Sequence, residues 1–96
     1  MKIALNKCYG DFHLSAAAHE ILDPIFPDAD WLNDEWLRTS PVLVDLIVEK
    51  GTEWVSAPYS KIVVKVLPDE ITDFTIMSYD GMEVCVFCVD GKIHLA

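Results

Sequence analysis

The sequence has few of the residues from which common ligand-binding loops are built. Its 96 residues include four glycines and three cysteines. It contains no glycine-rich phosphate loop, no nucleophile turn of the G-x-S-x-G kind and no aspartate-rich calcium loop. An odd number of cysteines leaves no complete disulfide framework, so free thiols in a reducing compartment are expected. We therefore predict no catalytic residues, no cofactor and no metal site.

Basic residues and long apolar runs are scarce as well. Seven Lys and Arg residues against 16 Asp and Glu residues give a net charge of -9 at pH 7. Nucleic acids and anionic membranes bind clusters of Lys and Arg, so this charge argues against both as direct partners and favours a basic or nucleic-acid-binding protein. No stretch approaches the roughly 18 apolar residues of a membrane span. Residues 1–7 lack the apolar segment of a signal peptide, and we expect a cytoplasmic protein.

The length predicts one domain, residues 1–96, and its first half predicts a strand followed by helices. Residues 2–8 read as a strand. Ser15 is typical of a helix N-cap, and Pro24 predicts the end of that helix. Its apolar stripe would consist of Ala18, Ile21, Leu22 and Ile25. A second helix is predicted over residues 42–50, where the start and stop signals are Ser40, Pro41 and Gly51.

The second half has the composition and spacing of strands. β-branched residues predict a strand over residues 62–66. Three further strands, which form a meander, are predicted over residues 74–79, 82–89 and 92–95. Their connections are the dipeptides preferred in type I′ turns, Asp80-Gly81 and Asp90-Gly91. We predict an α+β fold in which the N-terminal strand and the meander form one antiparallel sheet, packed by two or three short helices.

Two-residue turns also fix the register of the meander, so that Tyr79 lies opposite Met82 and Val89 lies opposite Lys92. One face of the meander then carries Thr75, Met77, Tyr79, Met82, Val84, Val86, Cys88, Ile93 and Leu95. The other carries Phe74, Ile76, Ser78, Glu83, Cys85, Phe87, Val89, Lys92 and His94. Neither face is polar, and the predicted helices can cover only one of them well. The uncovered face predicts a homodimer formed through the sheet face.

Two groups of cysteines and histidines resemble reactive sites. Cys85 and Cys88 have C-x-x-C spacing, but residues three apart in a strand point to opposite faces, so we interpret both as structural thiols rather than zinc or redox ligands. Cys8 lies near His13 and His19 in the sequence, which would permit a nucleophilic pair. No residue orients that pair, and we interpret it as part of an ordinary turn and a solvated helix face.

Acidic and tryptophan residues gather in residues 28–37, where the apolar spacing favours a short helical turn. We predict a partner-binding site in which one set of side chains steers encounter, namely Asp28, Asp30, Asp34 and Glu35. The second set anchors the contact, namely Trp31 and Trp36. The alternatives are acids that only keep a small apolar domain soluble and tryptophans that lie in the core.

Several blocks of the sequence resemble those of a known family. The opening block is Asn6-Lys7-Cys8-Tyr9-Gly10-Asp11-Phe12, followed by Leu14-Ser15. Later blocks include Arg38-Thr39-Ser40-Pro41, Lys61-Ile62-Val63-Val64 and Tyr79-Asp80-Gly81 with Glu83. Together they resemble small phage and prophage proteins that open with a strand, N-K-C-Y-G-G-F, L-S and a helix. This chain departs in having Asp11 for the second glycine and in lacking a charged, Trp-bearing tail.

The resemblance implies a phage-encoded protein acting in the host cell, without implying any catalytic residue. Small acidic phage proteins of this kind are similar, as a class, to anti-defence inhibitors, including anti-CRISPR proteins. We therefore predict a protein that binds a host protein by surface recognition and inhibits or modulates it. The alternatives are a phage structural or self-assembly module and a small-molecule-binding protein that uses the turn from Cys8 to His13.

Overall fold

The computed structural model describes residues 1–71 and 73–96. The first half contains β1 (Lys2–Asn6), α1 (Ala16–Leu22), the 3₁₀ helix η1 (Glu35–Thr39), α2 (Pro41–Lys50) and α3 (Thr52–Val55). The second half contains β2 (Ile62–Val66), β3 (Phe74–Tyr79), β4 (Met82–Val89) and β5 (Lys92–Leu95). This arrangement confirms the predicted α+β class.

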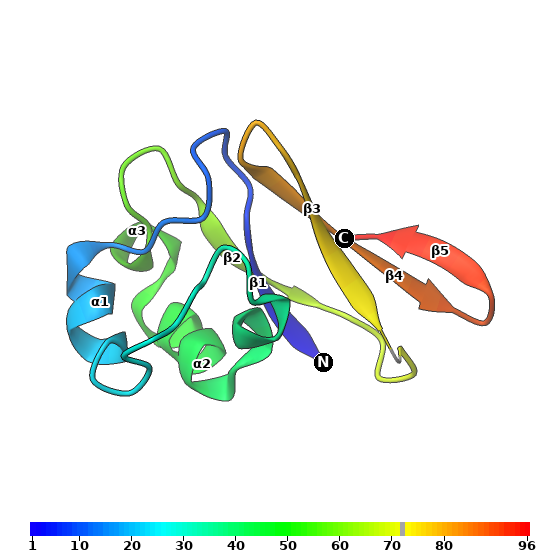
Figure 1. Ribbon diagram of the computed structural model, residues 1–96, viewed down its shortest axis with the longest axis horizontal. Helices are drawn as coiled ribbons and strands as arrows, with labels where there is room; N and C mark the ends of the chain where they lie inside the picture. The colour runs from blue at the N-terminus through cyan, green and yellow to red at the C-terminus, as the bar shows by residue number, and fades with distance from the viewer. Residues whose placement is uncertain (72) are drawn as a thin grey trace.

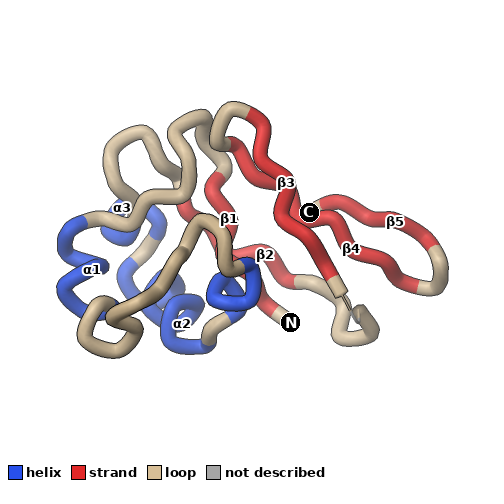
Figure 2. The backbone as a smooth tube through the Cα atoms, in the orientation of Figure 1, coloured by secondary structure: helices blue, strands red, loops and turns tan. Residues whose placement is uncertain are grey.

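The strands form two antiparallel sheets, β1-β2 and β3-β4-β5. The single sheet expected from the sequence is therefore wrong: β1 pairs with β2, with Ala4 opposite Val64, and not with the meander. Figures 1 and 2 show the helices on one side of β1 and β2 and the three-stranded sheet on the other. The two-stranded sheet is thus the middle layer of the molecule.

Each side of β1 contributes to a separate apolar core. Ala4 packs with the helices in the first core, which includes Leu22, Leu43 and Ile62. The opposite side of β1 forms the second core with β3 and β4, and its members include Ile3, Leu5, Phe74, Cys85 and Phe87. Alternation along β1 therefore places Ala4 toward the helices and Ile3 and Leu5 toward the meander, as the strand periodicity predicts.

The two main helices begin and end near the predicted residues. The Ser15 hydroxyl accepts a hydrogen bond from the Ala18 N–H at 3.1 Å, and α1 ends at Leu22. The predicted stripe of α1 is only partly correct, because Ile21 and Ile25 are exposed. In α2, Pro41 occupies the first turn and Gly51 ends the helix with φ of 93°, although the Ser40 side chain makes no capping bond.

The meander has the predicted strands and register. Tyr79 lies opposite Met82 and Val89 lies opposite Lys92. The turn glycines Gly81 and Gly91 have φ of 89° and 73°, which non-glycine residues rarely adopt. Turn geometry set by the two Asp-Gly pairs therefore fixed which residues share a face.

Candidate interaction surface

A buried ion pair joins η1 to β4. Arg38 is 0% exposed and Glu83 is 4% exposed. Two parallel bonds connect them, from Arg38 Nη1 to Glu83 Oε1 at 2.7 Å and from Nη2 to Oε2 at 2.8 Å. The Arg38 guanidinium also lies 3.6 Å from the centroid of the Phe12 ring, and its Nε donates to the Trp31 carbonyl. The pair therefore links four separate segments of the chain.

The same ion pair covers the outer edge of β1. The Asn6 N–H donates to Glu83 Oε1 at 2.8 Å, and Arg38 Nη1 donates to the Ala4 carbonyl at 3.3 Å. These backbone groups point away from β2, because alternate residues of a strand direct their polar groups to opposite edges. Two charged side chains thus satisfy the groups that a neighbouring strand would otherwise satisfy.

Residues of the opening motif complete this network. Asn6 Nδ2 donates to the carbonyls of Cys8 and Gly81 at 2.6 and 2.7 Å, and Asn6 Oδ1 accepts from the Lys61 N–H at 2.7 Å. Lys7 Nζ donates to the Glu83 carbonyl at 2.6 Å. Burial lowers the pKa of Lys7, and the nearby charge of Lys65 acts in the same direction. The motif is therefore a folding element that ties β1 to β4.

Two glycines permit close backbone contact beside the network. A Cβ atom on Gly10 would lie 2.0 Å from the Tyr59 carbonyl oxygen, and one on Gly81 would lie 2.3 Å from the Asp11 nitrogen. Asp11 has φ of 62°, so it takes the left-handed conformation that glycine adopts most readily. This turn is consequently packed against the loops at Tyr59 and Gly81.

The cysteine and histidine residues of the turn are not arranged as a nucleophilic pair. His13 is exposed, and His19 Nδ1 lies 2.9 Å from Asp23 Oδ1 on α1. No hydrogen bond joins Cys8 to His13 or His19 in the described part of the chain. A hollow of about 150 Å³ lies between this turn and the acidic segment, with His13, His19 and Asp30 in its lining.

The predicted partner-binding residues separate into three environments. Trp31 is 8% exposed and packs edge-on against Phe26, with ring centroids 5.6 Å apart. It is therefore a core residue, and the prediction that Trp31 anchors a partner does not hold for this structure. The short helical turn predicted within residues 28–37 is present only from Glu35, as η1, so Trp31 lies before it. Trp36 lies in η1 and is 56% exposed.

Glu35 and Trp36 lie against β3. Glu35 Oε1 accepts from the Thr75 hydroxyl at 2.9 Å and from the Ile76 N–H at 2.8 Å. The Trp36 ring packs edge-on against Phe74, with centroids 4.7 Å apart. Glu35 therefore holds η1 to the edge of β3 besides carrying charge, a role that its position in an acidic run did not reveal.

The remaining three acids, Asp28, Asp30 and Asp34, are exposed in the segment that leads into η1. Asp30 accepts from the Asn33 side chain at 3.0 Å and from the Asn33 N–H at 3.2 Å. These hydrogen bonds lower the pKa of Asp30, so its carboxylate stays charged at neutral pH. These side chains are free to face a partner.

Within the described residues, 1–71 and 73–96, no helix covers the face of the three-stranded sheet that points away from β1. We call it the outer face, and it consists of Thr75, Met77, Tyr79, Met82, Val84, Val86, Cys88, Ile93 and Leu95. Four of its large apolar side chains are strongly exposed: Met77 59%, Tyr79 75%, Ile93 75% and Leu95 69%. Contiguous exposed apolar patches are a known feature of contact surfaces, which makes the outer face the candidate interaction surface.

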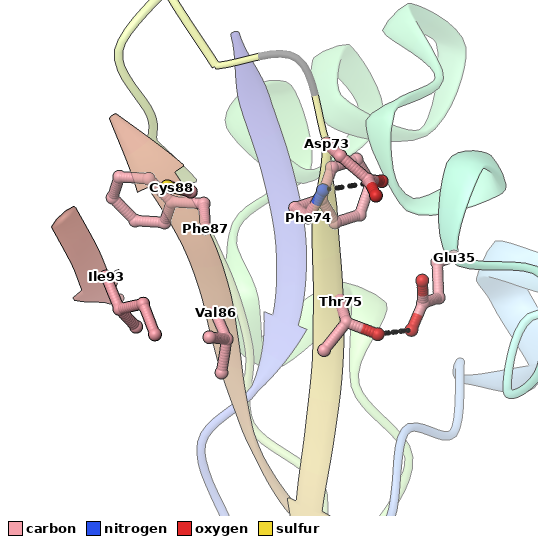
Figure 3. Close-up of a pocket in the computed structure, with 8 residues that line it drawn as sticks. All are labelled: Glu35, Asp73, Phe74, Thr75, Val86, Phe87, Cys88 and Ile93. Atoms are coloured by element: carbon pink, nitrogen blue, oxygen red, sulfur yellow. Dashed lines mark hydrogen bonds between the residues drawn. The ribbon is translucent and has the colours of Figure 1, made fainter. Parts of the chain in front are cut away.

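Two shallow depressions occupy the outer face and share Val86. The first has a volume of about 390 Å³ and is lined by Glu35, Asp73, Phe74, Thr75, Val86, Phe87, Cys88 and Ile93. Figure 3 shows Glu35 hydrogen-bonded to Thr75 on one side, with Val86 and Ile93 on the other. The second has a volume of about 310 Å³ and is lined by Met77, Ser78, Tyr79, Val84, Val86 and Leu95. Two carboxylates, Glu35 and Asp73, therefore line the first depression, whereas the residues that line the second carry no charge.

The two thiols of the C-x-x-C sequence lie on opposite faces of β4, as predicted. Cys85 is fully buried in the second core, whereas Cys88 is exposed on the outer face. Burial raises the pKa of the Cys85 thiol to about 11, and the charge of Glu35 acts in the same direction. The two sulfurs therefore cannot share one metal ion.

Within residues 1–71 and 73–96, no group of three or more His, Cys, Asp or Glu side chains is arranged to hold a metal ion. Among the described residues there is also no helix with the length and apolar content required to cross a membrane. Comparison with protein-family models, with curated proteins and with solved structures found no match.

Proposed function

We propose that this chain is a recognition protein that binds a host protein and inhibits or modulates it. The observation that carries the proposal is the uncovered outer face, with its exposed side chains of Met77 and Tyr79. The resemblance to phage proteins supplies the context, in which the partner is a component of the host cytoplasm and the class is that of anti-defence inhibitors, including anti-CRISPR proteins.

The charge around the outer face indicates the chemistry of the partner. Glu35 and Asp73 line its first depression, and Asp80 and Asp90 occupy the two turns that flank β4. Lys92 is the only Lys or Arg in residues 67–96. A complementary partner surface is apolar at its centre and carries Lys or Arg at its margin, because opposite charges raise the association rate and disfavour wrong partners.

Asp28, Asp30, Asp34 and the exposed ring of Trp36 extend this surface beyond β3. Trp36 contacts Phe74 at the end of β3, so it is the tryptophan suited to anchor a partner. Stacking two copies of this chain face to face would bring carboxylates of one copy against those of the other. We therefore favour a basic host protein over a second copy as the occupant of the outer face.

A pair of lysine variants tests the proposal. Met77→Lys places a charge on the outer face, and Val48→Lys places the same charge at a 68% exposed position on α2. We expect the native chain and Val48→Lys to retain the same partner from host lysate at low salt, and Met77→Lys to lose it. Retention should fall at high salt, since exposed ionic contacts are screened beyond about 10 Å at 0.1 M salt.

The retained protein is then identified by mass spectrometry and its activity measured with increasing amounts of the chain. Inhibition that saturates near a stoichiometric ratio supports the proposal. Combined reversal of Asp28, Asp30 and Asp34 to lysine should slow association roughly tenfold at low salt. Equal retention by Met77→Lys and the native chain, or recovery of the chain alone, would overturn the proposed function.

A further inference from the structure

The strand edges next to η1 are covered by charged side chains. Glu83 and Arg38 bind the outward backbone groups of β1, and Glu35 accepts from the Ile76 N–H of β3 at 2.8 Å. Ile76 points its N–H away from β4, because the ladder pairs Thr75 with Val86 and alternate residues face opposite edges. Backbone groups that are bound in this way cannot pair with another chain.

The edge formed by β5 differs. Cys85 and Ala96 exchange both backbone hydrogen bonds, each at 2.9 Å. Because alternate residues of a strand face opposite edges, the backbone groups of His94 point toward β4, and those of Ile93 and Leu95 point away from it. In the described part of the chain, no side chain hydrogen-bonds to either outward group. Their side chains are also the most exposed aliphatic ones on the outer face, at 75% and 69%.

We propose that β5 pairs antiparallel with β5 of a second copy of this chain about a twofold axis. The three strands of each copy would then form one continuous sheet. In this register Ile93 lies opposite Leu95 of the second copy, Leu95 lies opposite its Ile93, and the two His94 residues face each other. Every outward backbone group of these two residues gains a partner, which is the requirement that an isologous contact must meet.

Charge and position favour a second copy at this edge. Lys92 belongs to β5 itself and partly offsets Asp90 at the start of the hairpin, so the edge is less acidic than the rest of the meander. β5 also lies at the opposite end of the molecule from α1 (Figure 1), along a longest extent of 40 Å. Acids near α1 in two paired copies are therefore separated by far more than the screening length of about 8 Å at physiological salt.

This dimer goes beyond the proposed function and leaves the outer face open. Edge pairing joins the two outer faces side by side, so Met77 and Tyr79 of each copy stay accessible. The two proposals also differ in salt dependence. Salt weakens contact with a basic partner, whereas it strengthens association between two copies that each carry a charge of -9.

Sedimentation equilibrium of the full chain from micromolar to millimolar concentration tests the dimer. Ile93→Pro removes an outward N–H and leaves the pairing with β4 intact, because that N–H takes no part in the ladder. Leu95→Lys is a second variant, which places like charges near each other across the twofold axis. Val48→Lys is the matched control, at an exposed position far from β5 in the sequence.

We expect a native dimer that tightens as salt rises, and dissociation constants at least about tenfold weaker for Ile93→Pro and Leu95→Lys. Val48→Lys and Met77→Lys should dimerise as the native chain does. A native chain that stays monomeric up to about 1 mM, or a dimer that survives Ile93→Pro with unchanged affinity, would overturn the inference. Because Met77→Lys tests only partner binding, failure of the dimer and failure of the proposed function give different results.

Discussion

The two edges of the three-stranded sheet differ in whether other parts of the chain bind their outward backbone groups. At the β3 edge, Glu35 occupies a backbone N–H and Trp36 packs on Phe74. At the β5 edge, Ile93 and Leu95 expose both their backbone groups and their side chains. At the first edge a side chain of η1 thus takes up the outward N–H of Ile76, whereas at the second edge the outward groups of Ile93 and Leu95 are open to another molecule.

Around these edges, polar side chains are buried and apolar side chains are exposed, the reverse of the usual distribution. The interior contains Asn6, Arg38 and Glu83, each less than 5% exposed, while the aliphatic side chains of Ile93 and Leu95 lie exposed on β5. Polar side chains lie inside because strand edges there need hydrogen-bond partners and no water reaches them. The apolar residues remain outside where the fold supplies no cover, and this exposure is the basis for the binding surface proposed above.

The largest expected effect concerns the Arg38–Glu83 ion pair. We call the segments around this pair the closed region: β1, η1, the turn at Asp11 and the part of β4 that they contact. Arg38→Met leaves Glu83 charged and buried without its partner, which should lower the free energy of unfolding by about 3–5 kcal/mol. Urea denaturation monitored by tryptophan fluorescence measures this loss. Glu35→Gln is the comparison at a more exposed edge, where a loss of about 1 kcal/mol is expected.

The double variant Arg38→Met/Glu83→Met sharpens this test. Removing both charges eliminates the unpaired carboxylate, so part of the stability should return. Recovery should remain incomplete, because the Asn6 N–H and the Ala4 carbonyl lose their partners. If Arg38→Met cost no more than Glu35→Gln, the ion pair would not be the element that holds the closed region together.

A smaller effect is expected from one methyl group placed at each of the two turn glycines. Gly81→Ala and Gly91→Ala both strain a residue with positive φ, at a cost of about 1 kcal/mol. Only Gly81 touches the closed region, where the new Cβ would meet Asp11, so overpacking adds about 1–3 kcal/mol. Thermal unfolding of both variants measures the difference, and equal losses would show that the turn at Asp11 is not packed on the hairpin.

We call the meander β3-β4-β5 the open region. Its structure was largely predictable from the sequence, because its strands pair with their neighbours along the chain. Asp-Gly pairs with two-residue loops fixed the register from Phe74 to Leu95, and alternation then assigned each residue to a face. The same alternation placed Cys85 and Cys88 on opposite faces. Neighbouring residues along the chain thus sufficed to define the outer face, although not what binds there.

The closed region was not predictable in the same way, because its contacts join distant residues. Nothing local pairs Arg38 with Glu83 or β1 with β2, which are separated by more than 40 residues. Trp31 and Trp36 each follow an acidic residue and precede a leucine, yet tertiary packing buries Trp31 and exposes Trp36. One signal was present: Arg38 is an isolated cation between two acidic stretches, and a lone cation of this kind suggests a specific ion pair.

The last prediction compares the chemical reactivity of two thiols and does not concern the stability of the fold. Cys85 belongs to the second core and Cys88 to the outer face. Because burial raises the pKa of Cys85 to about 11, its reactive thiolate is rare at pH 8 and forms only as the pH rises toward 11. Iodoacetamide should therefore alkylate Cys88 at least about tenfold faster than Cys85.

Peptide mass mapping distinguishes these two thiols from Cys8, and the rates should converge once urea unfolds the chain. A partner on the outer face should slow the alkylation of Cys88, which lies opposite Ile93, and leave Cys85 unaffected. Similar rates for both thiols in the folded chain would mean that the second core opens readily. In that case the meander would open in solution and expose its buried face as well. The distinction between a closed and an open region would then be wrong.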